Sequence, residues 1–147
     1  MQPGAGPPIH VHWKQVESLT VISGRMATQE LGKEIKYYNP GETASFKKGV
    51  WHRFWNPGKE LLHIKGLIEP AHNLEFFLTE LYKAFDKGKK DRPSAMEGAF
   101  LIRRYRSEFA VHGLPPFVKN VIMPVQFFIG KITGAHRQFK NAPAPVK

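Results

Sequence analysis

The sequence predicts an all-β region followed by an all-α region, with one boundary near Pro70. Before this boundary the apolar pattern is short and β-like, and turn signals interrupt it repeatedly. After it, apolar residues recur at the spacing of a helix. We therefore expect a β-domain over residues 1–70 and a helical extension over residues 71–147. The 147 residues are enough to bury most of a real core without disulfides.

The β-region contains several short strand candidates. The segments MATQEL and EIKYY, joined through Gly32-Lys33, form a predicted hairpin with a tight turn. Asn39-Pro40-Gly41 is a second turn signal. The remaining candidates are ETASF, VWHRFW and LLHIKGLIE. Together they predict an antiparallel arrangement of short strands.

The first predicted helix covers roughly residues 72–87. Its apolar residues fall at i, i+4, i+7 and i+11, which is one face of a helix: Leu74, Leu78, Leu81 and Phe85. Gly88, flanked by Lys87, Lys89 and Lys90, ends this helix in a basic turn that suits the helix dipole.

Two further helices are expected. Ser94 and Glu97 have the spacing of a capping box, which begins a second helix running to about Val111. Pro115-Pro116 opens a third helical stretch, with a kink expected at Pro124. The tail NAPAPVK is predicted to be disordered.

The composition excludes several classes of protein. The chain contains no Cys, so disulfides, thiolate metal sites and Cys nucleophiles are excluded. No basic region followed by an apolar stretch marks a signal peptide, and we expect a cytoplasmic protein. The longest apolar run, residues 117–133, is interrupted by Lys119 and Lys131 and is a poor membrane span.

The formal net charge of +10 lies mostly in the second half of the chain. Such a charge suits an anionic ligand, nucleic acid or an anionic surface, although a solvated basic face is the simpler interpretation. Arg103, Arg104 and Arg106 with Tyr105 form a basic stretch that could touch phosphates. No recognition motif follows it, so we do not expect nucleic-acid binding.

Two histidines near the start of the chain are candidate metal ligands. His10 and His12 are two positions apart, so in a strand both side chains point to one face and can reach one ion. Glu17 is five positions beyond His12, and a regular strand would send it to the opposite face. The chain must therefore turn or bulge at Trp13-Lys14-Gln15 for Glu17 to join the same site.

His52 is a third candidate imidazole. It follows Gly49 by three residues, and Gly49 indicates a tight turn leading into a strand that Asn56 ends. By alternation, His52, Phe54 and Asn56 share one face of this strand, while Trp51, Arg53 and Trp55 share the other. If the His52 face is inward, the site has aromatic, apolar surroundings, which tune a bound metal.

The two histidine segments resemble the paired signatures of the cupins. His10-x-His12-x4-Glu17-x6-Gly24 is similar to the first signature. Gly41-x7-Gly49-x2-His52-x3-Asn56 is similar to the second. Lys47 departs from the pattern, because the second signature usually has Pro there. This departure affects the turn before Gly49 rather than a ligand. The resemblance covers roughly residues 5–70.

The resemblance implies a small antiparallel β-barrel, the cupin double-stranded β-helix. It also implies a metal held by His10, His12, Glu17 and His52. Three imidazoles and one carboxylate suit Mn, Fe, Co, Ni, Cu or Zn better than Ca or Mg. Four protein ligands leave an open position, where a substrate, water or dioxygen can bind.

Other candidate residues have weaker patterns. His63, His72, His112 and His136 lack ligand-like spacing and are expected to be structural or exposed, although His63 could face the barrel interior. The inward acid/base candidates are His63 and either Tyr37 or Tyr38. Lys47 and Lys48 lie near the expected barrel mouth and could attract an anionic ligand.

Two functions fit these features. The first is a metal-dependent cupin enzyme acting on a small molecule, with oxygenase- or isomerase-type chemistry. The second is a non-catalytic cupin that binds or senses a small molecule. A second acid/base group inside the barrel would distinguish them, because the fold alone does not decide function.

The expected barrel is short at its N-terminus. Only nine residues precede His10, most of them Pro, Gly or Ala, whereas cupin barrels usually have several strands there. An open strand edge invites pairing with another chain, so we predict a homodimer. The alternative is a helical tail that fills the gap within one subunit. We therefore expect the helices to pack on the barrel or at a dimer interface, and no membrane span.

Overall fold

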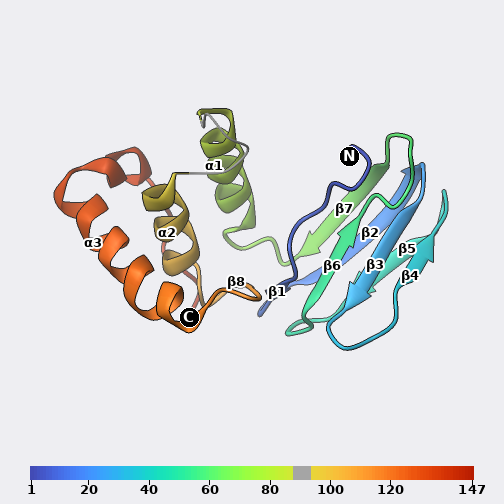
Figure 1. Cartoon of the computed structure of the whole chain (residues 1–147), viewed down its shortest axis with the longest axis horizontal. Coiled ribbons are helices and arrows are strands. Elements are labelled where there is room, and N and C mark those ends of the chain that lie inside the picture. The colour runs from blue at the N-terminus through green and yellow to red at the C-terminus, as the bar shows by residue number, and fades with distance from the viewer. Residues whose placement is uncertain (88–93) are drawn as a thin grey trace. The chain divides into compact units, whose positions relative to one another are not determined.

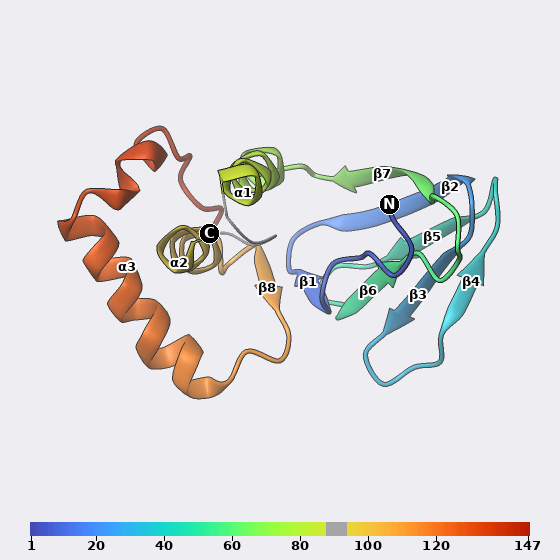
Figure 2. The same cartoon turned by 45° about the horizontal axis from the view of Figure 1, so that its top comes forward.

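A computed structural model describes residues 1–87 and 94–147 of the chain. The chain divides into two compact units. The first contains Met1–Pro70 together with Ala110–Gly113, and the second contains Ala71–Phe109 together with Leu114–Lys147. Figure 1 and Figure 2 show the strands of the first unit and the helices of the second.

The first unit is a cupin-type double-stranded β-helix made of two sheets (Figure 2). One sheet is five-stranded, in the order β4 (Lys36–Tyr38), β3 (Met26–Glu30), β6 (His52–Trp55), β1 (His10–His12) and β8 (Phe109–Val111). The other is three-stranded, in the order β5 (Thr43–Phe46), β2 (Val16–Ser23) and β7 (His63–Glu69). The prediction of a β-barrel followed by helices is confirmed.

Alternation along the strands builds the core between the sheets. On β2, Leu19 and Val21 are buried, while Ser18 and Thr20 face outward and contact Ser45 and Thr43 of β5 through their hydroxyls. The buried cluster that fills the barrel is Leu19, Val21, Met26, Ala44, Phe46 and Leu62. Phe46, a member of this set, also stacks on the ring of His52.

The predicted hairpin is confirmed as β3 and β4. Ala27 pairs with Tyr37 and Thr28 with Lys36, and Lys33 N–H donates to the carbonyl of Glu30 in the connecting turn. Because side chains alternate along the paired strands, Thr28, Lys36 and Tyr38 lie on the same face of the sheet.

The prediction that the second helix runs to about Val111 is wrong. Helix α2 (Ala95–Arg104) ends before that point, and residues 109–111 form strand β8, next to β1. The N–H of His112 donates to the carbonyl of Ile9 over 2.8 Å. A short apolar run such as Phe-Ala-Val fits either a helix or a strand, and here backbone pairing along the edge of β1 decides for the strand.

The second unit is helical. It contains α1 (Leu74–Lys87), α2, a π-helical turn η1 (Val118–Ile122), α3 (Met123–Ile132) and a short 3₁₀ helix η2 (Ala135–Phe139). The capping box of Ser94 and Glu97 is confirmed at the start of α2. A π-helical turn precedes Pro124, which lies in the first turn of α3, and the kink expected there stays a prediction.

The expected apolar face of α1 is partly confirmed. Leu74 is buried, and Leu78 and Leu81 are half-buried. The side chain of Phe85, and Gly88, Lys89 and Lys90, which were expected to end the helix, lie outside what the structure describes. Within the described residues, no helix combines the length and hydropathy needed to cross a membrane.

The expectation of a disordered tail is wrong. The guanidinium of Arg104 donates to the carbonyls of Ala142 and Pro143, and the hydroxyl of Tyr105 donates to Pro143. Asn73 and Ser107 donate to two further carbonyls of the tail. The tail is rich in Pro and Ala and forms no helix or strand, but its carbonyls are acceptors that side chains of the helical unit satisfy.

Candidate metal centre

Three of the four predicted ligands lie on neighbouring strands of the five-stranded sheet. His10 and His12 belong to β1, and His52 begins β6. The two strands are antiparallel, and His10 lies opposite His52 in their register. The i, i+2 spacing of His10 and His12 sends both rings to the face that His52 also occupies, as the sequence predicted.

Glu17 reaches this site from the other sheet. Strand β1 ends at His12, the chain bends, and β2 begins at Val16, so the predicted turn between His12 and Glu17 is confirmed. The turn carries the chain from the five-stranded to the three-stranded sheet. Glu17 therefore faces the histidines across the barrel interior instead of sharing a strand with them.

The four side chains converge. One nitrogen or oxygen atom from each of His10, His12, Glu17 and His52 lies within 4.8 Å of all the others. The Oε2 atom of Glu17 is 2.7 Å from Nε2 of His52, 3.6 Å from Nε2 of His12 and 3.8 Å from Nε2 of His10. His12, Glu17 and His52 are buried, and His10 is half-buried at the opening of the cluster.

Backbone carbonyls orient two of the imidazoles. Nδ1 of His10 lies 2.9 Å from the carbonyl of Pro8, and Nδ1 of His52 lies 2.9 Å from the carbonyl of Val50. A carbonyl oxygen only accepts, so Nδ1 of each ring donates its proton there and Nε2 is the atom left to face Glu17. This hydrogen bonding is the usual way in which a protein fixes the tautomer of a metal-binding histidine.

The donor set fits a cation. An unprotonated Nε2 presents a lone pair to the Glu17 carboxylate, and two acceptors at that distance repel each other. Either a proton on the ring or a metal ion between the groups removes this repulsion. Imidazole nitrogen with a carboxylate is the combination preferred by first-row transition metals, and His10, His12, Glu17 and His52 could together hold one.

The same contacts govern the ionisation of Glu17. Burial, the largest influence, would raise the pKa of its carboxyl, because a charged group is poorly solvated inside a barrel. The contacts with His10, His12 and His52, the shortest of which is the 2.7 Å hydrogen bond between Glu17 and Nε2 of His52, act in the opposite direction and together outweigh burial. They hold the pKa of Glu17 well below its usual range, so the carboxylate is ionised across the physiological range.

Aromatic rings surround the cluster. The ring of Phe46 on β5 stacks on His52 with centroids 3.9 Å apart and an interplanar angle of 8°, and Phe54 lies edge-on to His10 at 6.4 Å. The sequence indicated Phe54 by alternation but missed Phe46. Its signal was the alternation of ETASF, which places Ala44 and Phe46 on the buried face of β5.

Two turns of the cupin-like pattern hold the ligands in place. Gly49 has φ +77°, which favours glycine, and its N–H donates to the carbonyl of His12 over 2.8 Å. Val50 N–H donates to the carbonyl of Lys47 over 3.2 Å, so the turn closes with Lys where the family usually has Pro. Gly24 has φ +83°, and a Cβ there would lie 2.7 Å from the carbonyl oxygen of Leu61.

The structure separates the acid/base candidates. His63 and Tyr37 are exposed, and the guanidinium of Arg25 lies over the Tyr37 ring. Tyr38 instead packs against the apolar core and lines a cavity in the barrel. Of the three candidates, only Tyr38 is inside.

The other residues singled out from the sequence have structural contacts. His112 contacts Trp51, and His136 contacts Phe100 and Phe127 in the helical unit. His72 is exposed. Arg53 donates to Gln29 and so lies on the face away from the cluster, as expected.

The basic stretch of α2 is not presented as one surface. Arg104 donates to carbonyls of the tail, and Tyr105 is fully buried. A buried tyrosine has no face on which a nucleotide base could stack. Its burial and the contacts of Arg104 give both side chains roles within the helical unit.

Comparison with known proteins agrees with the architecture. The family model for the cupin domain, Cupin_2, matches residues 1–67. A probable oxidoreductase, virH, from Hypocrea virens is 33% identical over 68 residues, which is 45% of this chain and 31% of that protein. The chain thus spans about a third of the length of this curated relative.

Two solved structures resemble the β-unit. One is an uncharacterised protein with a double-stranded β-helix domain from Klebsiella pneumoniae, with 28% identity, a TM-score of 0.44, and coverage of 47% of this chain and 60% of that one. The other is a sugar phosphate isomerase of the cupin superfamily from Silicibacter pomeroyi, with 24% identity, a TM-score of 0.42, and coverage of 46% and 44%.

Proposed function

Because residues 1–67 form a cupin domain, we propose that this protein binds a divalent transition metal through His10, His12, Glu17 and His52 and acts on a small molecule held in the barrel. The observation that supports this most strongly is the convergence of the four donors, with Nδ1 of two histidines committed to backbone carbonyls. A metal in such a site supplies Lewis acidity and an open position for a ligand. Mn, Fe, Co, Ni, Cu and Zn all suit the donor set.

The residues of the chain have separate roles in this proposal. Glu17, held ionised by its contacts, contributes the negative charge that balances the cation. The carbonyls of Pro8 and Val50 keep the Nε2 atoms of His10 and His52 directed at it. Phe46 and Phe54 exclude water from one side, which strengthens electrostatic interactions in the site.

Oxygenase- or isomerase-type chemistry is the proposed activity. The similarity to a probable oxidoreductase supports the first, over the part of that protein that the chain covers. The inward position of Tyr38 is compatible with either, since its phenol can hydrogen-bond to a small molecule in the barrel. The alternative remains a cupin that binds or senses a small molecule without converting it.

Metal analysis of the purified protein tests the site. We expect about one metal ion per chain by elemental analysis after reloading, because the four donors form one cluster. His52→Ala should lower this content strongly, while His63→Ala, which changes an exposed histidine of the same barrel, should not. Unchanged stoichiometry in His52→Ala would contradict the assignment of His52.

The type of activity needs a second measurement. Metal-loaded protein is incubated with a panel of small organic acids and followed by NMR and by oxygen uptake. Oxygen uptake with loss of the acid identifies an oxygenase. A rearranged product of the same mass identifies an isomerase, and saturable binding without conversion identifies a binding protein.

A further inference from the structure

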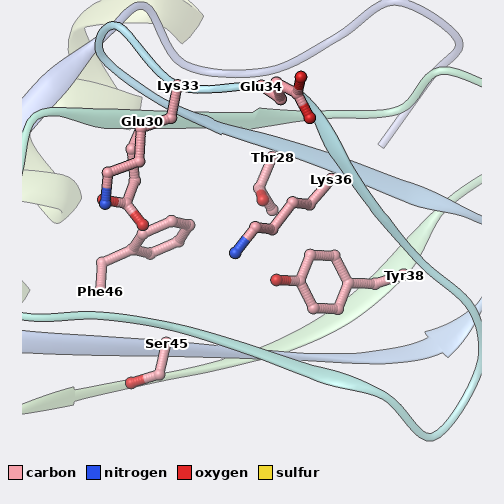
Figure 3. A pocket seen from close by; sticks show the side chains of 8 residues that line it. All are labelled: Thr28, Glu30, Lys33, Glu34, Lys36, Tyr38, Ser45 and Phe46. Carbon is pink, nitrogen blue, oxygen red and sulfur yellow. The ribbon is translucent and has the colours of Figure 1, made fainter.

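The first unit contains a cavity beside the metal cluster. It has a volume of about 60 Å³ and lies between strands β3 and β4 on one side and β5 on the other (Figure 3). Phe46 lines the cavity, and its ring also stacks on His52. Glu30, another lining residue, lies opposite His52 in the register of β3 and β6. The cavity and the cluster therefore share a wall.

Three polar groups point into this cavity. Figure 3 shows the ammonium of Lys36 and the hydroxyls of Thr28 and Tyr38 directed toward its middle. The strand register explains the grouping, because Thr28 pairs with Lys36 and Met26 pairs with Tyr38, which places all of them on the inner face. Thr28 is buried, Tyr38 is half-buried and Lys36 is exposed.

Lys36 is the cation available to a ligand. The carboxylate of Glu30 is engaged by Lys33 at 2.6 Å, and the carboxylate of Glu34 points away from the middle of the cavity (Figure 3). Within the described part of the chain, no carboxylate forms an ion pair with Lys36. An ammonium flanked by two hydroxyl donors matches an anionic oxygen acceptor, with hydrogen bonds strengthened by the charge.

The size of the cavity limits the ligand. A bound water needs roughly 10–15 Å³ measured in this way, so the cavity holds the equivalent of about four to six waters. That is far below the roughly 300 Å³ or more of a typical drug-sized site. The ring of Phe46 lines the cavity and suits contact with a short apolar carbon chain.

We propose that Lys36, Thr28 and Tyr38 form the anchoring subsite for the carboxylate of a short organic acid of a few carbons, whose other end faces the metal cluster. This inference rests on the proposed function for the role of the metal, but the anchoring itself belongs to residues of β3 and β4. Lys36 neutralises the carboxylate, and the two hydroxyls donate to its oxygens. The acid thereby enters the barrel in one orientation, with its carboxylate away from Glu17.

Titration of the metal-free protein with propionate tests the subsite. Amide chemical shifts in ¹⁵N-labelled protein should move saturably for residues of β3 and β4, with a dissociation constant in the millimolar range for so small a ligand. Propionamide, which has the same shape without the charge, should bind at least about tenfold more weakly. Inorganic phosphate should not displace propionate.

Matched variants locate the binding. Lys36→Met keeps the apolar stem and should weaken propionate binding by about tenfold, and Tyr38→Phe should weaken it by about threefold. Lys65→Met changes an exposed lysine on β7, and Tyr37→Phe changes an exposed tyrosine next to Tyr38. Both controls should bind propionate as the wild type does. The unchanged amide spectrum of the remaining strands confirms folding in each variant.

Three results would each contradict the proposed subsite. The amide chemical shifts of the wild type could fail to move saturably with propionate, or Lys36→Met and Lys65→Met could lose propionate affinity equally. Tighter binding of phosphate than of propionate would also contradict it. The outcome is separable from the proposed function. Loss of metal in His52→Ala with propionate binding independent of Lys36 rejects only the subsite. Propionate binding that depends on Lys36, in a protein that takes up no metal, rejects only the metal chemistry.

Discussion

Among the described residues, Glu17 is buried in the first unit and Glu108 in the second, and the two carboxylates are satisfied in different ways. In the barrel, Glu17 is surrounded by the imidazoles of His10, His12 and His52. In the helical unit, Glu108 is fully buried and accepts from the side-chain amide and backbone N–H of Asn73 and from the backbone N–H of Val146.

The partners decide what each carboxylate can do. Amide groups donate hydrogen bonds but have no second protonation state near neutral pH and no nitrogen lone pair for a metal. Glu108 is therefore fixed as an acceptor that holds the tail onto the helices. Imidazoles can donate, accept or ligate, so the environment of Glu17 can exchange a proton for a metal ion. Burial alone does not mark a functional carboxylate, whereas the chemistry of its partners does.

The largest expected effect is on the structural carboxylate. Glu108→Ala removes the acceptor of three hydrogen bonds, two buried and one partly buried, and at about 1 kcal/mol for each we expect a loss of about 3 kcal/mol in the free energy of unfolding. Urea unfolding followed by far-UV circular dichroism measures it. Ser107→Ala, which removes one neighbouring hydrogen bond to Val146, should cost only about 1 kcal/mol. Equal losses in the two variants would contradict the assigned role of Glu108.

The second largest expected effect is a loss of metal affinity when the barrel carboxylate, Glu17, is changed. Glu17→Gln keeps the shape of the side chain but removes its charge, so metal affinity should fall by about 100-fold or more, beyond the loss typical of a residue that only supports a ligand. Competition with a chelator measures this affinity. Glu69→Gln, an exposed change in the same unit, serves as the control. Retention of wild-type affinity in Glu17→Gln would remove Glu17 from the ligand set.

A smaller effect concerns the acid stability of the metal-free protein. The pKa of Glu17 is lower in the folded chain than its ordinary value of 4.5. Its contribution to stability is therefore complete above about pH 4.5 and is lost as the pH falls toward the folded pKa. Between pH 5 and about pH 3 the wild type should lose more stability than Glu17→Gln, as measured by urea midpoints. Parallel losses would show that the imidazoles do not hold the carboxylate ionised.

The smallest expected effect is on assembly. Helix α3 exposes Phe128 at 62% and Ile132 at 69%, and Phe117, just before the π-helical turn, is 65% exposed. We expect the homodimer to use this face and Phe128→Glu to shift it toward monomer in light scattering at low micromolar concentration. Lys119→Glu, on the same segment, controls for the added charge. A monomeric wild type would reject the dimer and favour packing of the helices on the barrel.

Much of the site could be predicted from the sequence, because its signals are local. The i, i+2 spacing of His10 and His12, the odd separation of Glu17 and the glycine turn before His52 each fix a side-chain direction within a few residues. The order of β-strands and helices followed from periodicity in the same way. The capping box at Ser94 is another local signal, complete within four residues.

The remaining features depend on residues far apart in the chain. Strand β8 was predicted as helix, because its pairing with β1 joins segments about 100 residues apart and leaves no local trace. The tail was predicted to be disordered, because its composition does not reveal that Asn73, Arg104 and Ser107 supply donors to its carbonyls. Phe46 and His52 are close in the chain, but their contact depends on the packing of two sheets, because β5 and β6 belong to different ones.

By itself, the sequence determined which residues could act as ligands and on which face of its strand each would lie, since backbone geometry fixes side-chain direction over short distances. Only the tertiary structure decided which faces meet. It brought Glu17 from one sheet to three imidazoles of the other, placed Lys36 and Tyr38 along the lining of one cavity, and left His63 and Tyr37 in solvent. The packing of two sheets is set by the sum of many distant apolar contacts, and no short stretch of the chain encodes that sum.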